Sequence, residues 1–305
     1  MFTATLIADG TLNDAILSEA AQQIAMAGGK LTGIDWLGES FAGDIHFEKT
    51  LSFPDAPLSL LADALEPIGS HMGSHMDVIV QPTAEREKRV LVADMDSTMI
   101  TVECIDELAH YAGIKPEIAA ITERAMRGEL DFGAALDARV ALLAGMDEGV
   151  IERCLAERVR ITPGAEVLVR TMRARGAVCV LVSGGFTRFA EPVARAIGFT
   201  GAVANVLEIA DGRLTGRVAR PIVGADRKVV ELDRAAAEVG VGMEACLAVG
   251  DGANDLPMIR RAGLGVAYRA KPVVAAAAGA RIEWGDLSAL LYAQGIARTE
   301  WVEAL

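Results

Sequence analysis

The 305-residue sequence is poor in aromatic residues (5%) and in cysteine (four residues), and it lacks any run of 18 apolar residues. Without such a run we predict no membrane-spanning helix. Residues 1–5 lack the basic stretch that opens a signal peptide, so we expect none. The four cysteines lie far apart, with no Cys-x-x-Cys pair. We therefore expect reduced thiols in a cytoplasmic protein, and neither a disulfide framework nor a zinc site.

Basic residues are also few: 29 Lys and Arg stand against 42 Asp and Glu, for a net charge of -13. An acidic chain repels polyanions, so we expect no nucleic-acid partner and no anionic membrane surface. A small anionic substrate can still find local cations in a pocket. The sequence also lacks a P-loop, a complete Gly-x-Gly-x-x-Gly, His-Glu-x-x-His and Gly-x-Ser-x-Gly. These absences argue against the nucleotide-binding, zinc-protease and serine-hydrolase classes that carry those motifs.

Residues 1–82 form a pattern of their own. Apolar alternation predicts strands at 2–8, 31–37, 44–47 and 77–80, and helical spacing predicts helices around 16–24 and 58–65. The order βαββαβ is that of a ferredoxin-like α+β domain, and at this length it resembles an ACT-like module. Residues 69–76 repeat Gly-Ser-His-Met, which fits a cloning scar or a polar loop, and the polar stretch 81–88 predicts a linker.

Residues 83–305 alternate strands with helices. Short apolar runs predict strands at 89–93, 177–182, 245–249 and 264–267, and the runs 202–209 and 214–218 flank an Asp-Gly turn. Helical patterns occupy roughly 103–160 and 165–175. This alternation predicts an α/β domain with a doubly wound, Rossmann-like parallel sheet and a helical cap insertion at about 101–162.

Two carboxylates follow the first strand of this predicted sheet. Asp94 and Asp96 stand in Asp-Met-Asp-Ser-Thr, at the edge where open α/β sheets place their ligands. Two carboxylates held close together need a cation or a proton between them. Oxygen ligands of this kind favour Mg²⁺, which also contacts substrate phosphate. A solvated loop that ends in a helix cap remains the alternative.

Three further junctions carry polar groups in compatible positions. Gly-Asp-Gly-Ala-Asn-Asp, with Asp251 and Asp255, follows the strand that ends at residue 249. Ser183 and Gly184 follow another buried strand, where a hydroxyl and backbone N–H groups can hold phosphate oxygens. Lys228 can supply a positive charge. Taken singly, Ser183-Gly184 also fits an ordinary strand-to-helix turn and Lys228 a solvated surface.

Together these four motifs, in this order, resemble those of the haloacid dehalogenase-like phosphatase superfamily over about residues 85–290. The runs at 94–103, 125–132, 139–140, 182–186 and 265–272 are similar to those of its phosphoserine phosphatases. The ACT-like module fits the bacterial two-domain form of these enzymes. The resemblance implies Mg²⁺-dependent hydrolysis of O-phosphoserine to serine and phosphate, the last step of serine biosynthesis.

The resemblance also implies roles for the carboxylates. Asp94 would be the nucleophile that forms an aspartyl-phosphate, and Asp96 the general acid and then the general base. Asp94, Asp251 and the backbone carbonyl of Asp96 would hold Mg²⁺. Asn254 and Asp255 would support the metal site and the phosphate from close range.

The substrate contacts follow from the same resemblance. Ser183, Gly184 and Lys228 would bind the phosphoryl oxygens. Glu103 would take the ammonium group of the substrate, and Arg139 its carboxylate. Without the resemblance, Glu103 and Arg139 fit charges on a helix surface.

A small apolar lid over the site would contain Met126 and Phe132, which fit the core of the cap equally well. Two other functions stay open. One is hydrolysis or transfer of phosphate on another small phosphomonoester, and the other is a signalling module that is phosphorylated on Asp94. A homodimer and an amino-acid ligand on the N-terminal module are also left open.

Overall fold

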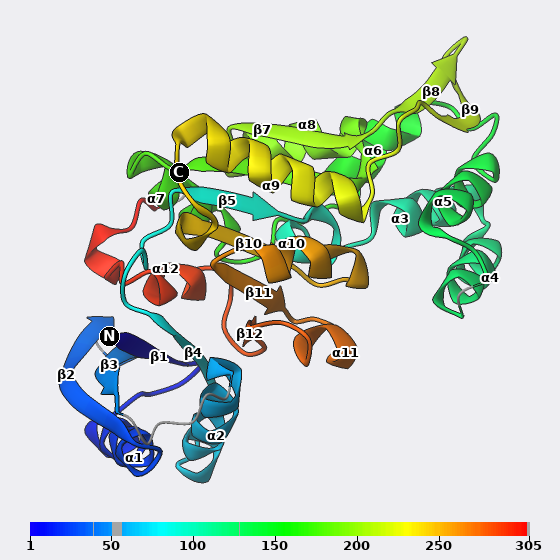
Figure 1. Cartoon of the computed structure of the whole chain (residues 1–305). Helices are drawn as coiled ribbons and strands as arrows, with labels where there is room; N and C mark the ends of the chain where they lie inside the picture. Colours follow the sequence, from blue (N-terminus) through cyan, green and yellow to red (C-terminus); the bar gives the residue numbers. More distant parts are fainter. Residues whose placement is uncertain (39, 51–56, 128, 304–305) are drawn as a thin grey trace.

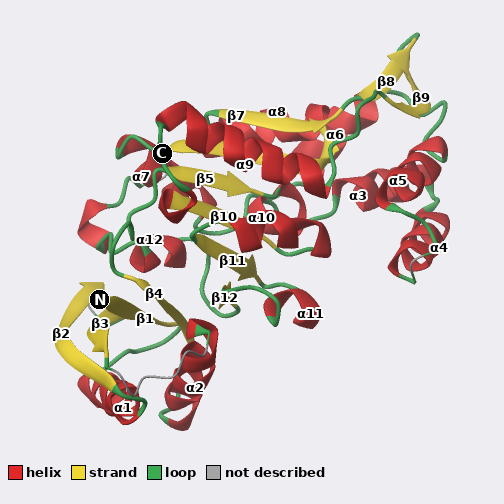
Figure 2. Cartoon of the chain, viewed as in Figure 1, coloured by secondary structure: helices red, strands yellow, loops and turns green. Residues whose placement is uncertain are grey.

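A computed structural model describes residues 1–38, 40–50, 57–127 and 129–303. The chain forms a four-stranded antiparallel sheet near the N-terminus and a six-stranded parallel sheet, with a helical region beyond the latter (Figures 1 and 2). The strand orders are β2-β3-β1-β4 and β12-β11-β10-β5-β6-β7. This confirms the predicted fold class.

The antiparallel sheet carries helices on one face. Its elements are β1 (Phe2–Ala8), α1 (Asp14–Met26), β2 (Gly29–Gly38), β3 (Ala42–Lys49), α2 (Leu58–His71) and β4 (Met76–Pro82). Alternation along β1 sends Ala4 and Leu6 into the core beneath the helices. Asn13 caps α1 by accepting the Ile16 N–H at 3.0 Å. The predicted order βαββαβ is therefore confirmed.

Two boundaries in this region differ from the sequence prediction. Helix α2 continues to His71, so the first part of the Gly-Ser-His-Met repeat is helical, and Ser74 and Met76 are buried. Gln81 and Pro82 belong to β4 and not to a linker. Gln81 is buried because its amide donates a hydrogen bond to Ala293 O at 2.7 Å, a contact too distant in the chain for the sequence to show.

The parallel sheet is doubly wound. Its strands are β5 (Val90–Ala93), β6 (Val178–Phe186), β7 (Gly201–Asn205), β10 (Cys246–Gly250), β11 (Leu264–Tyr268) and β12 (Ala280–Ile282). Its helices are α7 (Ala165–Ala174), α8 (Thr187–Ile197), α9 (Ala225–Val239), α10 (Leu256–Arg261), α11 (Pro272–Ala275) and α12 (Ala289–Ala293). Along β5, Val90 and Val92 pack with residues of α9, whereas Leu91 and Ala93 pack with residues of α7 and α8. Both faces are thus covered, as the continuous apolar strands predict.

Between β5 and α7, the described residues of the insertion form four helices. They are α3 (Cys104–Ala112), α4 (Lys115–Met126), α5 (Phe132–Ala141) and α6 (Gly149–Glu157). A hairpin of β8 (Leu207–Ala210) and β9 (Arg213–Val218) packs beside α5 (Figure 1). The predicted single strand over 202–209 is wrong, because the chain leaves the parallel sheet after β7 and starts the hairpin only at Leu207.

Short turns complete the fold: η1 (Met95–Met99), η2 (Met243–Ala245), η3 (Ala253–Asp255) and η4 (Arg298–Glu300). All four cysteines are buried free thiols. None of the helices in the described ranges combines the length and the apolar character that crossing a bilayer requires.

Arg86, whose side chain is 10% exposed, joins the antiparallel sheet to α12. Arg86 pairs with Asp44 of β3, with its two terminal nitrogens 2.6 Å from the carboxylate oxygens. The same guanidinium donates to Thr5 Oγ1 at 2.8 Å and to the backbone oxygens of Tyr292 and Ala293 at 3.0 and 2.8 Å. One side chain therefore satisfies acceptors on both sides of the junction.

Candidate active site

The two carboxylates of the first motif stand at the end of β5. Asp94 donates its N–H to Val249 O of β10 at 3.0 Å, which extends the strand pairing by one residue. The chain then bends through η1, where Ser97 has a φ of 55° in the left-handed region. Thr98, at the end of this turn, donates its hydroxyl to Asp251 Oδ1 at 3.2 Å. The turn thereby brings the first and last motifs together.

A fully buried lysine lies behind Asp94. Lys228 Nζ contacts Asp94 Oδ1 and Asp255 Oδ1, and its side chain has no exposed surface. Asp255 Oδ2 accepts the Gly252 N–H at 2.9 Å. Burial and the neighbouring Asp255 raise the pKa of Asp94 well above its usual value. Burial alone would lower the pKa of Lys228, but the two carboxylates outweigh it and raise this pKa.

Asp96 is held on the other side of the turn. Its Oδ1 accepts the Cys104 N–H at 3.0 Å, and its Oδ2 lies 3.4 Å from the Ser183 hydroxyl. A Cβ on Gly185 would lie 2.7 Å from Asp96 Oδ2, so a residue without a side chain is required there. Burial, and then the charge of Glu103, raise the pKa of Asp96 to about 7. This carboxyl can therefore carry a proton near neutral pH.

A cavity of about 650 Å³ opens beside these carboxylates. Glu103 and Arg139, from the start of α3 and from α5, line it together with Asp94 and Asp96. Ser97 donates its hydroxyl to Glu103 Oε1 at 2.7 Å. Burial lowers the pKa of Arg139, and the nearby acidic side chains oppose that effect. The cavity thus offers a carboxylate and a guanidinium near Asp94 and Asp96.

Phe132 closes one side of this cavity. Its ring lies against two glycines, because a Cβ on Gly184 would be 3.0 Å from Phe132 Cζ and one on Gly224 would be 3.3 Å from Phe132 Cδ1. Asn205 fixes the backbone beneath the ring by donating to Gly184 O at 2.9 Å and to Val223 O at 3.1 Å. The first residue of α5 thus reaches from the cap to the parallel sheet.

Three carboxylates could hold a metal ion. Oxygen atoms of Asp94, Asp251 and Asp255 lie within 4.8 Å of one another. Burial, and then the charge of Asp255, raise the pKa of Asp251 to about 6. Asp255 already binds Lys228 and Gly252 through its two oxygens. An oxygen-only donor set fits Mg²⁺, with Asp94 and Asp251 better placed as direct ligands than Asp255.

Most of the predicted residues meet at this cavity. The predicted residues that line it are Asp94, Asp96, Glu103, Phe132, Arg139, Gly184, Asp251 and Asn254. Ser183, Lys228 and Asp255 are buried behind the lining. The side chain of Met126 lies outside the part that the structure describes.

The sequence prediction missed four polar residues of the lining: Ser97, Asp106, Thr122 and Lys271. Asp106 could have been found, because it stands three residues after Glu103 and so shares a helix face with it. Lys271 follows β11, whose carboxyl end lies at the same sheet edge as the motifs.

Comparison with known proteins agrees with the fold. The family model described as haloacid dehalogenase-like hydrolase matches residues 91–260. A haloacid dehalogenase family hydrolase from Salmonella enterica serovar Typhi superposes with a TM-score of 0.80 and 28% identity, covering 96% of this chain and 98% of that chain. The chain therefore belongs to the haloacid dehalogenase-like hydrolase family.

The curated relatives are more specific. Phosphoserine phosphatase from Streptomyces coelicolor is 47% identical over 244 residues, which are 80% of this chain and 59% of that protein. Phosphoserine phosphatase from Streptococcus thermophilus is 47% identical over 200 residues, which are 66% of this chain and 93% of that protein. The chain spans about three fifths of the length of the first curated relatives it matches.

Proposed function

We propose that the protein hydrolyses O-phosphoserine to serine and phosphate with Mg²⁺, as the last step of serine biosynthesis. The observation that carries this proposal is one cavity that unites Asp94 and Asp96 with Glu103 and Arg139. The first pair suits phosphoryl transfer, and the second suits the ammonium and carboxylate groups of an amino acid. The similarity to phosphoserine phosphatases supports the same substrate.

The chemistry uses the two carboxylates in turn. Asp94 attacks phosphorus through Oδ2, since Lys228 engages Oδ1, and an aspartyl-phosphate forms as the bond to the serine oxygen breaks. Asp96 donates a proton to the departing serine oxygen. It then takes a proton from the water that attacks phosphorus and releases phosphate. The raised pKa of Asp96 suits both roles.

A metal ion would be held by Asp94, Asp251 and the backbone carbonyl of Asp96. Bound there, Mg²⁺ would screen the negative charges of the carboxylate and the phosphate from each other. Asp255 and Asn254 would keep this part of the site in shape.

Phosphoryl oxygens would be bound by the Ser183 hydroxyl, the Gly184 backbone and Lys228. Phe132 and Met126 would form the lid that excludes water. The Phe132 ring against Gly184 is the contact that supports lid closure in this chain.

The domain division is part of the same proposal: an ACT-like domain at 1–82, and a phosphatase domain at 83–305 with its cap at about 101–162. Four buried thiols fit a reducing cytoplasm. A homodimer would be detected by light scattering, and an amino-acid ligand of the N-terminal domain by calorimetry with serine.

A substrate panel tests the activity. Phosphate release from phosphoserine, phosphothreonine, phosphoethanolamine and a sugar phosphate would be measured with Mg²⁺ and with EDTA. We expect selective turnover of phosphoserine that stops in EDTA and in Asp94→Asn. Equal rates on all esters would refute the substrate assignment. A stable, stoichiometric phosphoprotein without turnover would refute the enzymatic one.

A further inference from the structure

The cavity contains one cation that the proposed mechanism does not use. Lys271 follows β11, lines the cavity and is exposed. In the part of the chain that the structure describes, no hydrogen bond or ion pair engages its Nζ. Its ammonium group is thus free to meet a ligand.

Acidic side chains outnumber basic ones in the lining. The acidic side chains in it are Asp94, Asp96, Glu103, Asp106 and Asp251. Of the two basic side chains among the described lining residues, Arg139 is surrounded by acidic neighbours, which leaves Lys271 as the uncommitted one. A doubly negative phosphomonoester that approaches such a cavity in an acidic protein is attracted by a cation at its mouth.

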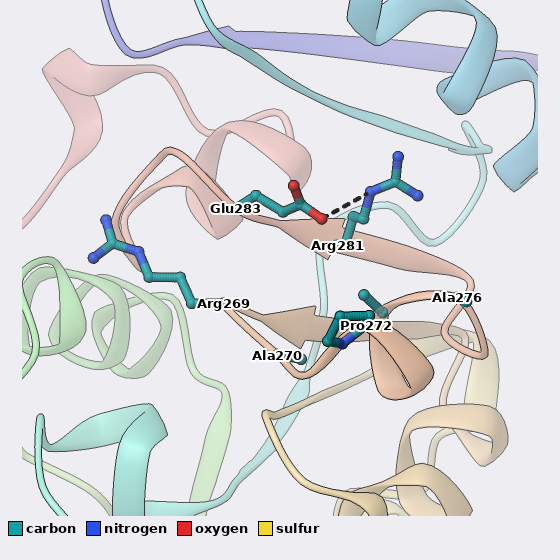
Figure 3. A pocket seen from close by; sticks show the side chains of 7 residues that line it. Arg269, Ala270, Pro272, Ala276, Arg281 and Glu283 are labelled. Carbon is teal, nitrogen blue, oxygen red and sulfur yellow. Dashed lines mark ion pairs between the residues drawn. The ribbon is translucent and has the colours of Figure 1, made fainter.

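The turn that carries Lys271 depends on a remote contact. Arg269 has a φ of 43°, a left-handed conformation that a non-glycine residue adopts only when its surroundings hold it there. Its guanidinium donates to Trp284 O and Gly285 O, each at 3.2 Å. Figure 3 shows the Arg269 side chain pointing away from Arg281 and Pro272. A hollow of about 510 Å³ borders this turn, so core packing does not hold it from that side.

The N-terminal sheet fixes the segment that Arg269 grips. Asp77 of β4 accepts the N–H groups of Glu283 at 2.8 Å and Gly285 at 2.7 Å, and that of Trp284 at 3.2 Å. His75 stacks on Trp284 with ring centroids 3.8 Å apart. A continuous chain of contacts therefore leads from β4 through residues 283–285 and Arg269 to Lys271.

We propose that Lys271 is a further substrate-binding residue that attracts the anionic substrate, and that the N-terminal sheet positions it through Asp77 and residues 283–285. This inference rests on the proposed function for the identity of the substrate. The N-terminal sheet thereby contributes to substrate affinity through the position of Lys271.

Kinetics of Lys271→Met and Lys271→Arg test the first half. We expect Lys271→Met to raise KM for phosphoserine about fivefold or more, with kcat nearly unchanged and a weaker dependence of kcat/KM on salt. Lys271→Arg should recover most of the affinity. Lys30→Met, on the exposed strand β2, removes the same charge elsewhere and should change nothing. An unchanged KM in Lys271→Met, or equal losses in Lys271→Met and Lys30→Met, would overturn the role of Lys271.

Asp77→Ala tests the second half. It should raise KM about threefold in the wild-type background and add nothing in the Lys271→Met background, since both changes act through one side chain. Independent, additive effects would refute the positioning role.

The affinity for inorganic phosphate, measured by calorimetry with Mg²⁺, separates the inference from the proposed function. A protein that hydrolyses no phosphoserine would refute the function alone. If Lys271→Met then bound phosphate about fivefold more weakly than wild type, the role of Lys271 in binding the anion would still be supported. Equal phosphate binding by the two proteins would overturn that role.

Discussion

At the scale of single residues, burial decides which charged side chains keep their usual protonation. Asp96 and Lys228 show the two outcomes. Asp96 is half-buried with another carboxylate nearby, and its pKa rises to about 7. Lys228 is buried between two carboxylates and stays charged. Burial thus raises the pKa of a carboxyl such as Asp96, whereas two carboxylate partners reverse its effect on the pKa of Lys228.

Asp96→Asn should keep the fold and lose the reaction. The amide oxygen can still accept the Cys104 N–H, but it can neither donate a proton to the serine oxygen nor accept one from water. We expect kcat to fall about 10²- to 10⁴-fold, with KM within a few-fold of wild type. Steady-state phosphate release measures this, with Asp35→Asn on exposed β2 as the control. A kcat within threefold of wild type would exclude Asp96 as the acid.

Lys88 should make stability depend on pH in the alkaline range. Burial lowers its pKa from 10.5 to about 8, and Nζ donates to Glu244 O at 2.8 Å. Between these two pH values the unfolded chain binds more protons than the folded one, so the free energy of unfolding rises with pH. Below about pH 8 Lys88 is protonated in both the folded and the unfolded state, so this increase in the free energy of unfolding is absent.

Urea unfolding at pH 7.5 and 9.5 measures the effect as the difference between wild type and Lys88→Met. We expect wild type to gain about 1–2 kcal/mol relative to the variant on going to the higher pH. A difference that stays constant, or that changes in favour of Lys88→Met, would contradict the lowered pKa.

At the scale of elements, Phe132 at the start of α5 contacts Gly184 and Gly224 and thereby joins the cap to the parallel sheet. Phe132→Ala should raise KM about tenfold, because the ring no longer excludes water from the cavity. Gly224→Ala should raise KM by less, because the new Cβ would lie 3.3 Å from Phe132 Cδ1 and would only displace the ring. Gly201→Ala, whose Cβ meets only open space, is the matched control. Gly224→Ala should have no effect in the Phe132→Ala background, and an undiminished effect there would exclude the contact.

Sequence patterns predict the structural features that depend on residues close together in the chain. The apolar alternation of β1 and the continuous apolar run of β5 identify their strands because burial repeats along the element. The motif residues at the ends of β5 and β10 are predictable because parallel strands share one carboxyl edge. The burial of Gln81 was missed because its partner, Ala293 O, belongs to a segment far away in the chain. The break between β7 and β8 was missed because both strands are apolar.

At the scale of the whole molecule, the ion pair of Arg86 with Asp44 lies where the antiparallel sheet meets α12. Arg86→Leu would leave the carboxylate of Asp44, which is 1% exposed, without its cation. We expect a loss of about 3–5 kcal/mol in the free energy of unfolding, measured in urea. Arg260→Leu, an exposed arginine on α10, should change stability by less than about 0.5 kcal/mol. Equal free energies of unfolding for Arg86→Leu and Arg260→Leu would mean that the Arg86–Asp44 pair contributes nothing to stability.

The strand order of the parallel sheet has a consequence for synthesis on the ribosome. Strand β5, which leads to Asp94, lies between β6 and β10, and β10 is translated about 150 residues after it. At roughly 5–20 residues per second, one edge of β5 waits roughly 8–30 seconds for its neighbour. A nascent chain therefore exposes one edge of this apolar strand until about 150 further residues have been made, and the carboxylates that follow β5 and β10 cannot meet before then.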